Sequence, residues 1–331
     1  RSFYSLTILV VPSLLSLILD MACSNPAKFF PANTTIALRD GAMKNKVALI
    51  TGGGTGIGKA IATTFAALGA KVAIAARRTE VLEKTAADIR KSTGGVCEPF
   101  KMDVKDPTLV AAAIDEIEKK FGQTPNVLVN NAAGNFIMAT ERLSDNAVGT
   151  VVDIVLKGTM RVTKEVGQRC IKNGTGCSVL SITTPYARAG APFVVPSAIS
   201  KSGVETMTKS LATEWAKYGL RLNAIAPGPF PTEGAFGRLS TMTFEEAVEA
   251  AATTVPLGRC GALEELGNLS AFICSDYGNF INGAIIDIDG AQQHHNHGSS
   301  FSPALHEMSS EDWAEIEEKI RGRTSKSKSK I

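Results

Sequence analysis

The sequence has few of the features that mark secreted, metal-binding, nucleic-acid-binding or membrane-spanning proteins. Its six cysteines include no pair at Cys-x-x-Cys spacing, which indicates reduced interior thiols instead of a disulfide framework or a zinc site. The 35 basic and 32 acidic residues leave a net charge of only +3, too small to indicate a nucleic-acid surface. The apolar run at 6–19 is broken by Pro12 and is too short to span a bilayer. We therefore expect no resident metal, no nucleic-acid partner and no stable membrane insertion.

The two ends of the chain differ in composition from the middle. Residues 1–42 are expected to form an N-terminal extension, in which the run at 6–19 is a signal-peptide core, part of an organelle transit segment or upstream translated sequence. The last two interpretations are favoured, with Met21 as the natural start. Residues 299–331 are expected to form a helix over 310–321 and a basic, serine-rich tail. The tail ends in Ser-Lys-Ile, which is close to the Ser-Lys-Leu peroxisomal address but is also compatible with an ordinary basic tail.

Between these ends, short β-branched runs alternate with longer amphipathic stretches. Strands are expected near 47–50, 71–75, 96–102, 126–129, 178–182, 221–225 and 284–288. Such alternation predicts an α/β fold, a doubly wound parallel sheet covered by helices on both faces, in a single domain over 43–298. Residues 229–256 follow the carboxyl end of a predicted strand, where ligands bind in this architecture. We interpret them as a small substrate lid with a helix over 244–252.

A glycine-rich turn follows the first predicted strand. Gly52, Gly56 and Gly58 have TGxxxGxG spacing, and the following residues have helical periodicity. Glycine allows the backbone conformation and the close approach that place a pyrophosphate at the start of the next helix. Because a strand precedes the glycines and a helix follows them, the turn predicts a dinucleotide site that includes Thr55 and Ile57.

The second predicted strand ends in Ala-Ala-Arg-Arg at 75–78, with no acidic residue to bind ribose hydroxyls. An arginine at this position pairs with a 2′-phosphate through charge-assisted hydrogen bonds. Arg77 therefore favours NADPH as the cofactor, and the alternative is that the arginines are simply solvated.

Further motifs follow in a characteristic order: Asp103-Val104, the Asn-Asn-Ala-Ala-Gly segment at 130–134, and Pro227-Gly228. With the glycine-rich turn, they identify residues 43–290 as resembling the short-chain dehydrogenase/reductase family. The resemblance implies a Rossmann fold, a homotetramer and contact between Asp103 and adenine. It also implies that the loop beginning at Pro227 lies near the nicotinamide. The residues predicted there are Pro227, Gly228, Pro229 and Phe230.

The catalytic tetrad of that family, Asn-Ser-Tyr-Lys, is altered at three positions. Val155 replaces the asparagine, Thr184 the serine and Ser197 the tyrosine, whereas Lys201 is retained one helical turn after Ser197. In the family such a lysine holds the nicotinamide ribose. A serine hydroxyl is much less acidic than a phenol, so this set does not suit the protonation of a carbonyl oxygen.

The altered set itself resembles the 2,4-dienoyl-CoA reductases, especially the mitochondrial type with a tyrosine just after Ile-Thr-Thr. The segments that carry this resemblance are 130–136, 140–144, 181–186 and 193–201. It implies that Tyr186 takes over the role of the phenol and that Asn135 joins it in binding the thioester oxygen. Ser197 would then position a water or a cofactor group.

The chemistry of this reaction explains why the usual acid is dispensable. Hydride delivered to the δ carbon of a dienoyl thioester moves negative charge onto the thioester oxygen, so the transition state needs two hydrogen-bond donors there. The resemblance implies NADPH as hydride donor and trans-3-enoyl-CoA as product, in the β-oxidation of unsaturated fatty acids. It also suggests contacts with the unsaturated acyl-CoA from Arg77, Lys105, Phe136, Ser144 and Arg238. For Lys105, a surface charge near a cleft is an equal alternative.

Two other functions remain open at this point. One is another short-chain reductase that acts on a 3-oxoacyl or carbonyl substrate, although Ser197 and Val155 disfavour that chemistry. The other is a catalytically inactive NADP-binding sensor or assembly subunit. The mitochondrial-type motifs indicate a mitochondrion as the location, and the Ser-Lys-Ile end gives the peroxisome as the alternative.

Overall fold

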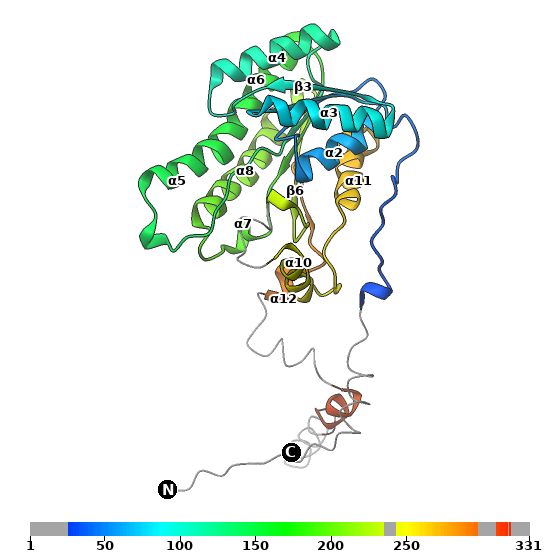
Figure 1. Cartoon of the computed structure of the whole chain (residues 1–331), viewed down its shortest axis with the longest axis vertical. Coiled ribbons are helices and arrows are strands. Elements are labelled where there is room, and N and C mark those ends of the chain that lie inside the picture. The colour runs from blue at the N-terminus through cyan, green and yellow to red at the C-terminus, as the bar shows by residue number, and fades with distance from the viewer. Residues whose placement is uncertain (1–25, 235–242, 297–308, 317, 319–331) are drawn as a thin grey trace, which may run out of the picture.

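A computed structural model describes residues 26–234, 243–296, 309–316 and 318 (Figure 1). Its centre is a seven-stranded sheet in the order β3-β2-β1-β4-β5-β6-β7, in which every neighbouring pair is parallel. The strands are β1 (Val47–Thr51), β2 (Lys71–Ala76), β3 (Val96–Lys101), β4 (Val127–Asn130), β5 (Cys177–Ile182), β6 (Leu220–Pro227) and β7 (Ile285–Ile288). All seven expected strands are present, and the prediction of a doubly wound parallel sheet is confirmed.

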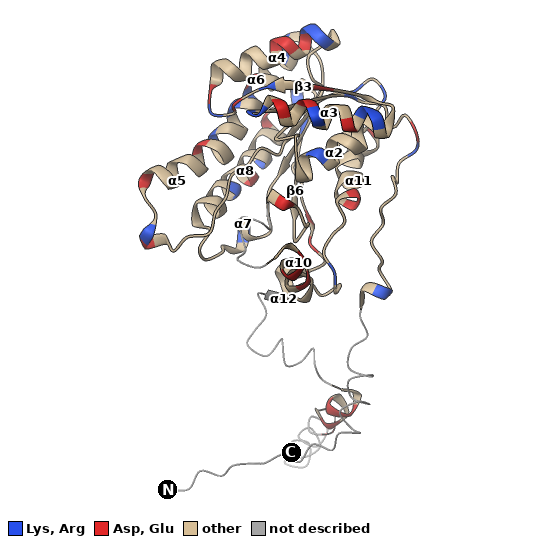
Figure 2. Ribbon diagram, viewed as in Figure 1, with Lys and Arg blue, Asp and Glu red and all other residues tan. Residues whose placement is uncertain are grey.

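Three long helices cover each face of the sheet. One face carries α2 (Gly56–Ala67), α3 (Thr79–Thr93) and α11 (Leu263–Cys274); the other carries α4 (Pro107–Phe121), α6 (Gly158–Asn173) and α8 (Val195–Glu214). The shorter elements are η1 (Pro26–Lys28), η2 (Thr140–Arg142), α5 (Asp145–Val152), η3 (Asp153–Lys157), α7 (Tyr186–Ala189), η4 (Ala216–Tyr218), α10 (Phe244–Thr253), η5 (Asp276–Gly278) and α12 (Gln292–Asn296). Acidic and basic positions are spread along α3, whereas in α4 they gather in the C-terminal half of the helix (Figure 2).

The two-residue period of β1 divides the core into two layers. Ala48 and Ile50 pack in the cluster with α2 and α11, whereas Val47 and Leu49 pack in the cluster with α4 and α8. Because successive side chains of a strand point to opposite faces, a fully apolar strand must be covered on both sides. All five residues of β1 are buried, so the continuous apolar run seen in the sequence follows from its central place in the sheet.

Local sequence signals explain where the long helices begin and which side they bury. Asp106 precedes Pro107 and caps α4, since its carboxylate accepts hydrogen bonds from the backbone N–H groups of Thr108 at 2.8 Å and Leu109 at 3.2 Å. In α2, Ile61 and Phe65 recur at helical spacing and are fully buried.

Part of the predicted N-terminal extension packs against the body of the protein. The side chain of Asn268 in α11 donates to the carbonyl of Thr35 at 2.7 Å and accepts from the N–H of Ala37 at 2.9 Å. Arg259 donates from Nε to the carbonyl of Phe30 at 2.7 Å. The segment that precedes β1 therefore lies along α11, while the run at 6–19 lies outside the described residues.

The predicted lid is described only in part. Its helix, α10, is confirmed and begins with a capping box, in which Thr243 and Glu246 each bond the other's backbone N–H, at 2.9 and 3.3 Å. Near the C-terminus, residues 310–316 are helical, as expected. Within the described ranges, no helix is long and apolar enough to cross a membrane. The tail and residues 235–242 lie outside those ranges.

Candidate active site

The glycine-rich turn joins β1 to α2 in a conformation that requires glycine. Gly52 and Gly56 have φ angles of 66° and 53°, in the left-handed region that other residues rarely adopt. Glycine is required at position 58 for a different reason, because a Cβ built there would lie 2.4 Å from the carbonyl oxygen of Gly52. The turn leaves the N-terminus of α2 open, and such a turn fits a dinucleotide pyrophosphate.

Asn131, which follows β4, fixes this turn from the next strand of the sheet. Its Nδ2 donates to the carbonyl oxygens of Thr51 at 3.0 Å and Gly52 at 3.2 Å. The hydroxyl of Thr51 accepts from the backbone N–H groups of Asn131 and Ala132. Asn131 lies inside the Asn-Asn-Ala-Ala-Gly motif at 130–134, but this role of its side chain was not predicted from the sequence.

A cleft of about 1900 Å³ runs along the carboxyl ends of the strands. Of the residues predicted from the sequence, it is lined by Gly52, Thr55, Gly56, Ile57, Arg77, Asp103, Asn135, Tyr186, Ser197 and Lys201. Thr34 and Thr232 also line it, and neither was predicted. The cleft therefore brings the predicted phosphate, ribose and catalytic residues together in one place.

Other predicted residues lie outside this lining, as far as the structure describes the chain. They are Gly58, Lys105, Phe136, Ser144, Pro227, Gly228, Pro229 and Phe230, and Arg238 is outside the described residues. Lys105 is exposed just after β3. The hydroxyl of Ser144 accepts from the N–H of Ala147 at 3.2 Å and so caps α5. This structural role accounts for Ser144 without a ligand, and its contact with the substrate remains a prediction.

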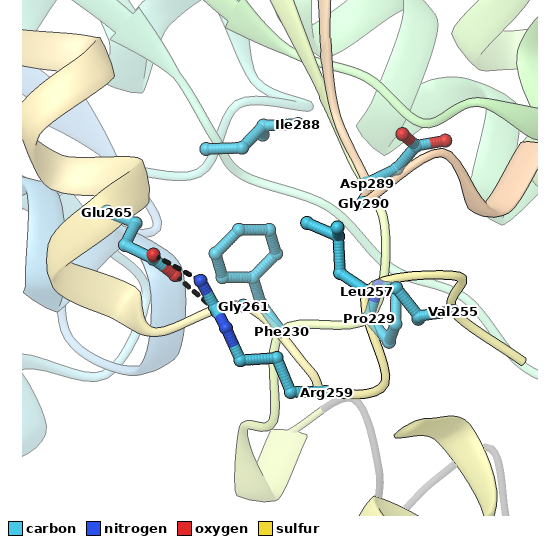
Figure 3. Close-up of a pocket in the computed structure, with 10 residues that line it drawn as sticks. All are labelled: Pro229, Phe230, Val255, Leu257, Arg259, Gly261, Glu265, Ile288, Asp289 and Gly290. Carbon is cyan, nitrogen blue, oxygen red and sulfur yellow. Dashed lines mark hydrogen bonds and ion pairs between the residues drawn. The ribbon is translucent and has the colours of Figure 1, made fainter. Parts of the chain in front are cut away.

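Pro229 and Phe230 line a separate pocket of about 170 Å³ (Figure 3). The ring of Phe230 is 4% exposed, and a Cβ built on Gly261 would lie 2.4 Å from it. Across the pocket, Arg259 forms an ion pair with Glu265 at 2.7 Å. Phe230 is thus part of the core that supports the loop, and its predicted contact with the cofactor remains untested.

One end of the cleft contains Arg77, which directly follows β2. It is exposed and precedes Arg78, the N-cap residue of α3. Arg77 and Arg78 line the same cleft as the glycine-rich turn. Together with the left-handed glycines, this arrangement suits a dinucleotide that carries an additional phosphate.

Three polar side chains meet at the other end of the cleft. The Oη of Tyr186 lies 3.2 Å from Oγ of Ser197, and Nδ2 of Asn135 donates to Tyr186 Oη at 3.4 Å. The Oδ1 of Asn135 accepts from the N–H of Phe136 at 2.9 Å, which directs the amide NH₂ toward the phenol. The arrangement supplies a phenol and an amide as two adjacent donors.

These side chains come from three elements. Asn135 follows β4, Tyr186 begins α7 just after β5, and Ser197 lies in the first turn of α8. Carboxyl ends of neighbouring parallel strands share one edge of the sheet, so residues far apart in sequence meet there. Pro185 has helical φ and ψ angles of −57° and −35° at the start of α7, and the phenol beyond it reaches Ser197.

Lys201 lies one turn after Ser197 in α8 and is 8% exposed. Its Nζ donates to the carbonyl of Ile182 at the end of β5. Burial disfavours the charged form and lowers the pKa of Lys201 to about 8. Lys201 lines the cleft together with Ser197 and Tyr186.

The remaining altered tetrad positions offer no acid. Val155 is fully buried in the π-helical segment η3, and its side chain has no polar atom. Thr184 is 8% exposed, and its carbonyl accepts the N–H of Ala187 at the start of α7. The site therefore suits the stabilisation of an oxyanion better than the protonation of a ketone oxygen.

Comparison with known proteins shows the family to which the chain belongs. A family model described as enoyl-(acyl carrier protein) reductase matches residues 52–291. A crystal structure of a short-chain dehydrogenase from Bacillus anthracis superposes with a TM-score of 0.70 at 40% identity and covers 77% of this chain and 100% of that one. The chain belongs to the short-chain dehydrogenase/reductase family.

Within that family, relatives named as dienoyl-CoA reductases are similar over most of the chain. One from Caenorhabditis elegans, a probable 2,4-dienoyl-CoA reductase of the (3E)-enoyl-CoA-producing type, is 64% identical over 308 residues, which is 93% of this chain and 100% of the relative. A peroxisomal 2,4-dienoyl-CoA reductase from Danio rerio is 35% identical over 248 residues, which is 75% of this chain and 81% of the relative. An uncharacterised oxidoreductase from C. elegans is 65% identical over 306 residues, covering 92% and 98% of the two chains.

Proposed function

We propose that the protein is an NADPH-dependent 2,4-dienoyl-CoA reductase that forms trans-3-enoyl-CoA. The observation that carries this proposal is the meeting of Tyr186, Asn135 and Ser197 in the cleft that also holds the glycine-rich turn. Similarity to relatives with that name supports it. The role belongs to the β-oxidation of unsaturated fatty acids.

In the proposed reaction, NADPH supplies a hydride that forms a C–H bond at the δ carbon. The two conjugated double bonds become one between the β and γ carbons, and the electron pair moves to the thioester oxygen. Tyr186 Oη and Asn135 Nδ2 donate hydrogen bonds to this developing oxyanion. A proton then adds at the α carbon from water or a weak acid, and Ser197, 3.2 Å from the phenol, positions that donor.

Lys201 and Arg77 would hold the cofactor at two points. The amine of Lys201 would donate to the nicotinamide ribose, which lies beside the catalytic groups. The guanidinium of Arg77 would pair with the 2′-phosphate at the opposite end of the cleft. Asp103, which lines the cleft after β3, would contact the adenine.

The alternatives are less consistent with the site. A 3-oxoacyl or carbonyl reductase needs an acid at the position of Ser197, and the phenol has moved to Tyr186. An inactive NADP-binding subunit has no need for the hydrogen bonds that join Tyr186 to Asn135 and Ser197.

One assay separates these functions. NADPH oxidation is followed at its absorbance band with a 2,4-dienoyl-CoA and, separately, with a 3-oxoacyl-CoA. Turnover of the dienoyl-CoA, with little or none of the 3-oxoacyl-CoA, is the expected result. The reverse preference would assign a 3-oxoacyl reductase, and NADPH binding without turnover of either would assign a non-enzymatic protein.

We also propose a mitochondrial location and a homotetrameric assembly, with the peroxisome as the alternative location. Met160 on α6 and Ile199 on α8 are 45% and 54% exposed and would be covered by neighbouring subunits. Sedimentation velocity of the purified protein tests the assembly. Imaging of two tagged versions, one with each terminus left free, tests the location.

A further inference from the structure

A cluster of ion-paired side chains lies outside the lining of the cleft and includes Arg188, in the helix that begins with Tyr186. Arg188 of α7 donates from both terminal nitrogens to the carboxylate of Asp287 in β7. The bond from Nη1 to Oδ2 is 3.0 Å long. The Nε of the same arginine lies 3.5 Å from Oε2 of Glu205 in α8. Arg188 thus joins three elements, and Tyr186 is two residues before it.

Glu205 is the member of this cluster that most needs its partners. The residue is 3% exposed, and its Oε1 accepts from the hydroxyl of Thr183 at 3.2 Å. Burial raises the pKa of Glu205, and the neighbouring Arg188 acts in the opposite direction. Burying a carboxylate without a partner costs free energy. The ion pair with Arg188 therefore stabilises Glu205, and Glu205 in turn fixes the position of the guanidinium.

The helix that carries Tyr186 is too short to set its own direction. α7 has only four residues and ends at Ala189, just before Gly190, whose φ angle is 78°. An isolated turn of helix is not stable in water, so its orientation comes from contacts with other elements. Arg188 provides the ionic contacts, and Ser202 of α8 donates from its hydroxyl to the carbonyl of Ala187.

We propose that Arg188 is a positioning residue for catalysis, acting through Glu205 and Asp287. It anchors α7 so that the phenol of Tyr186 lies between Asn135 and Ser197. The inference rests on the proposed role of Tyr186 as an oxyanion donor. Arg188 lies outside the lining of the cleft, and the proposal gives it no direct contact with cofactor or substrate.

The test compares Arg188→Met with Arg188→Lys and with a control, Arg169→Met. Arg169 is also ion-paired and 19% exposed at its side chain, but it bonds Asp115, Glu118 and Glu165, far from the site. For Arg188→Met, kcat for the dienoyl-CoA should fall about tenfold or more, since small displacements of catalytic groups have large effects. The KM for NADPH should be unchanged. Arg188→Lys keeps the positive charge but not the guanidinium that bonds both carboxylates, so it should recover part of kcat. Arg169→Met should retain the wild-type kcat.

Arg188→Met leaves a buried carboxylate unpaired, so a second variant protects the test against loss of folding. The double variant Arg188→Met/Glu205→Gln removes the charge of the arginine together with the charge of its buried partner, Glu205. It should show the same fall in kcat. Wild-type kcat in this folded double variant would overturn the proposal.

Hydrogen exchange supplies a readout that does not depend on activity. The amides of Ala187 and Gly190 donate to the carbonyls of Thr184 and Tyr186, and these two bonds hold the turn that contains α7. Peptides that cover 184–190 should exchange faster in the Arg188 variants and at the wild-type rate in Arg169→Met. Unchanged exchange in the Arg188 variants would overturn the positioning role. If the wild type did not reduce dienoyl-CoA, the proposed function would fail, and the exchange result would still decide whether Arg188 anchors α7.

Discussion

Replacing Tyr186 by phenylalanine removes one hydroxyl from the centre of the proposed site. That oxygen lies 3.2 Å from Ser197 Oγ and 3.4 Å from Asn135 Nδ2. The ring is retained, so the fold loses only these hydrogen bonds, worth about 1 kcal/mol each in stability. Catalysis should lose far more, because one donor to a developing oxyanion contributes about 2.7–4 kcal/mol, or roughly a hundredfold to a thousandfold in kcat.

The binding of NADPH should be nearly unaffected by this substitution. The glycine-rich turn and Arg77 lie at the ends of β1 and β2, whereas Tyr186 follows β5. The expected result is therefore a sharp fall in kcat at a normal dissociation constant for NADPH. Steady-state NADPH oxidation with saturating dienoyl-CoA measures the first quantity, and quenching of protein fluorescence by NADPH measures the second.

Two further variants show whether the effect is specific. Tyr218→Phe removes a hydroxyl from a tyrosine in η4 that is 44% exposed and should leave kcat unchanged. Ser197→Ala should lower kcat less than Tyr186→Phe, since the serine acts only through its neighbour or a water. A kcat for Tyr186→Phe close to that of the wild type would refute the reasoning and remove the phenol from the mechanism. A larger loss from Ser197→Ala than from Tyr186→Phe would assign the main donor to the serine.

Three other outcomes are expected. Arg77→Ala should shift the ratio of kcat/KM with NADPH to kcat/KM with NADH by about tenfold or more toward NADH, because a charged hydrogen bond is lost. An unchanged ratio would argue against 2′-phosphate binding by Arg77. The pKa of Lys201 is about 8, below the value of 10.5 for a lysine in an unfolded chain. Between pH 8 and pH 10.5 the unfolded state therefore binds more protons than the folded state. As the pH rises through this range, Lys201 makes the cofactor-free protein more stable. Urea midpoints at pH 8 and pH 10 should show a smaller rise in Lys201→Met than in the wild type. Phe230→Ala should lower the free energy of unfolding by about 3–5 kcal/mol, measured in urea, and a negligible change would mean that the ring is not part of the core.

Much of the fold follows from local sequence patterns. The apolar runs that begin at Val47 and Val72 predict strands because their side chains alternate between two buried faces. The glycines at 52 and 56 predict a phosphate turn because only glycine readily adopts their φ angles. These signals depend on neighbours a few residues away and are therefore readable without a structure.

The roles of individual loop residues were less predictable. Phe230 follows a motif that contacts the nicotinamide in the family, but its ring packs into the core beside Gly261. Ser144 caps a helix. The direction of the Phe230 ring is not encoded in its local sequence, because it is set by packing against Gly261 and the rest of the core. The direction of Ser144 is set locally, by its bond to Ala147 three residues later.

The sequence by itself determined the class of fold, the cofactor turn and the loss of the usual tyrosine at Ser197. Only the tertiary structure decided that Tyr186 reaches Ser197 and that Asn135, 51 residues earlier, completes the group. It also decided that Arg188 bonds Asp287, 99 residues later. The physical reason is that the periodicity of strands and helices depends on residues close together in the sequence. A set of catalytic side chains instead comes together only where the carboxyl ends of several parallel strands meet at one edge of the sheet.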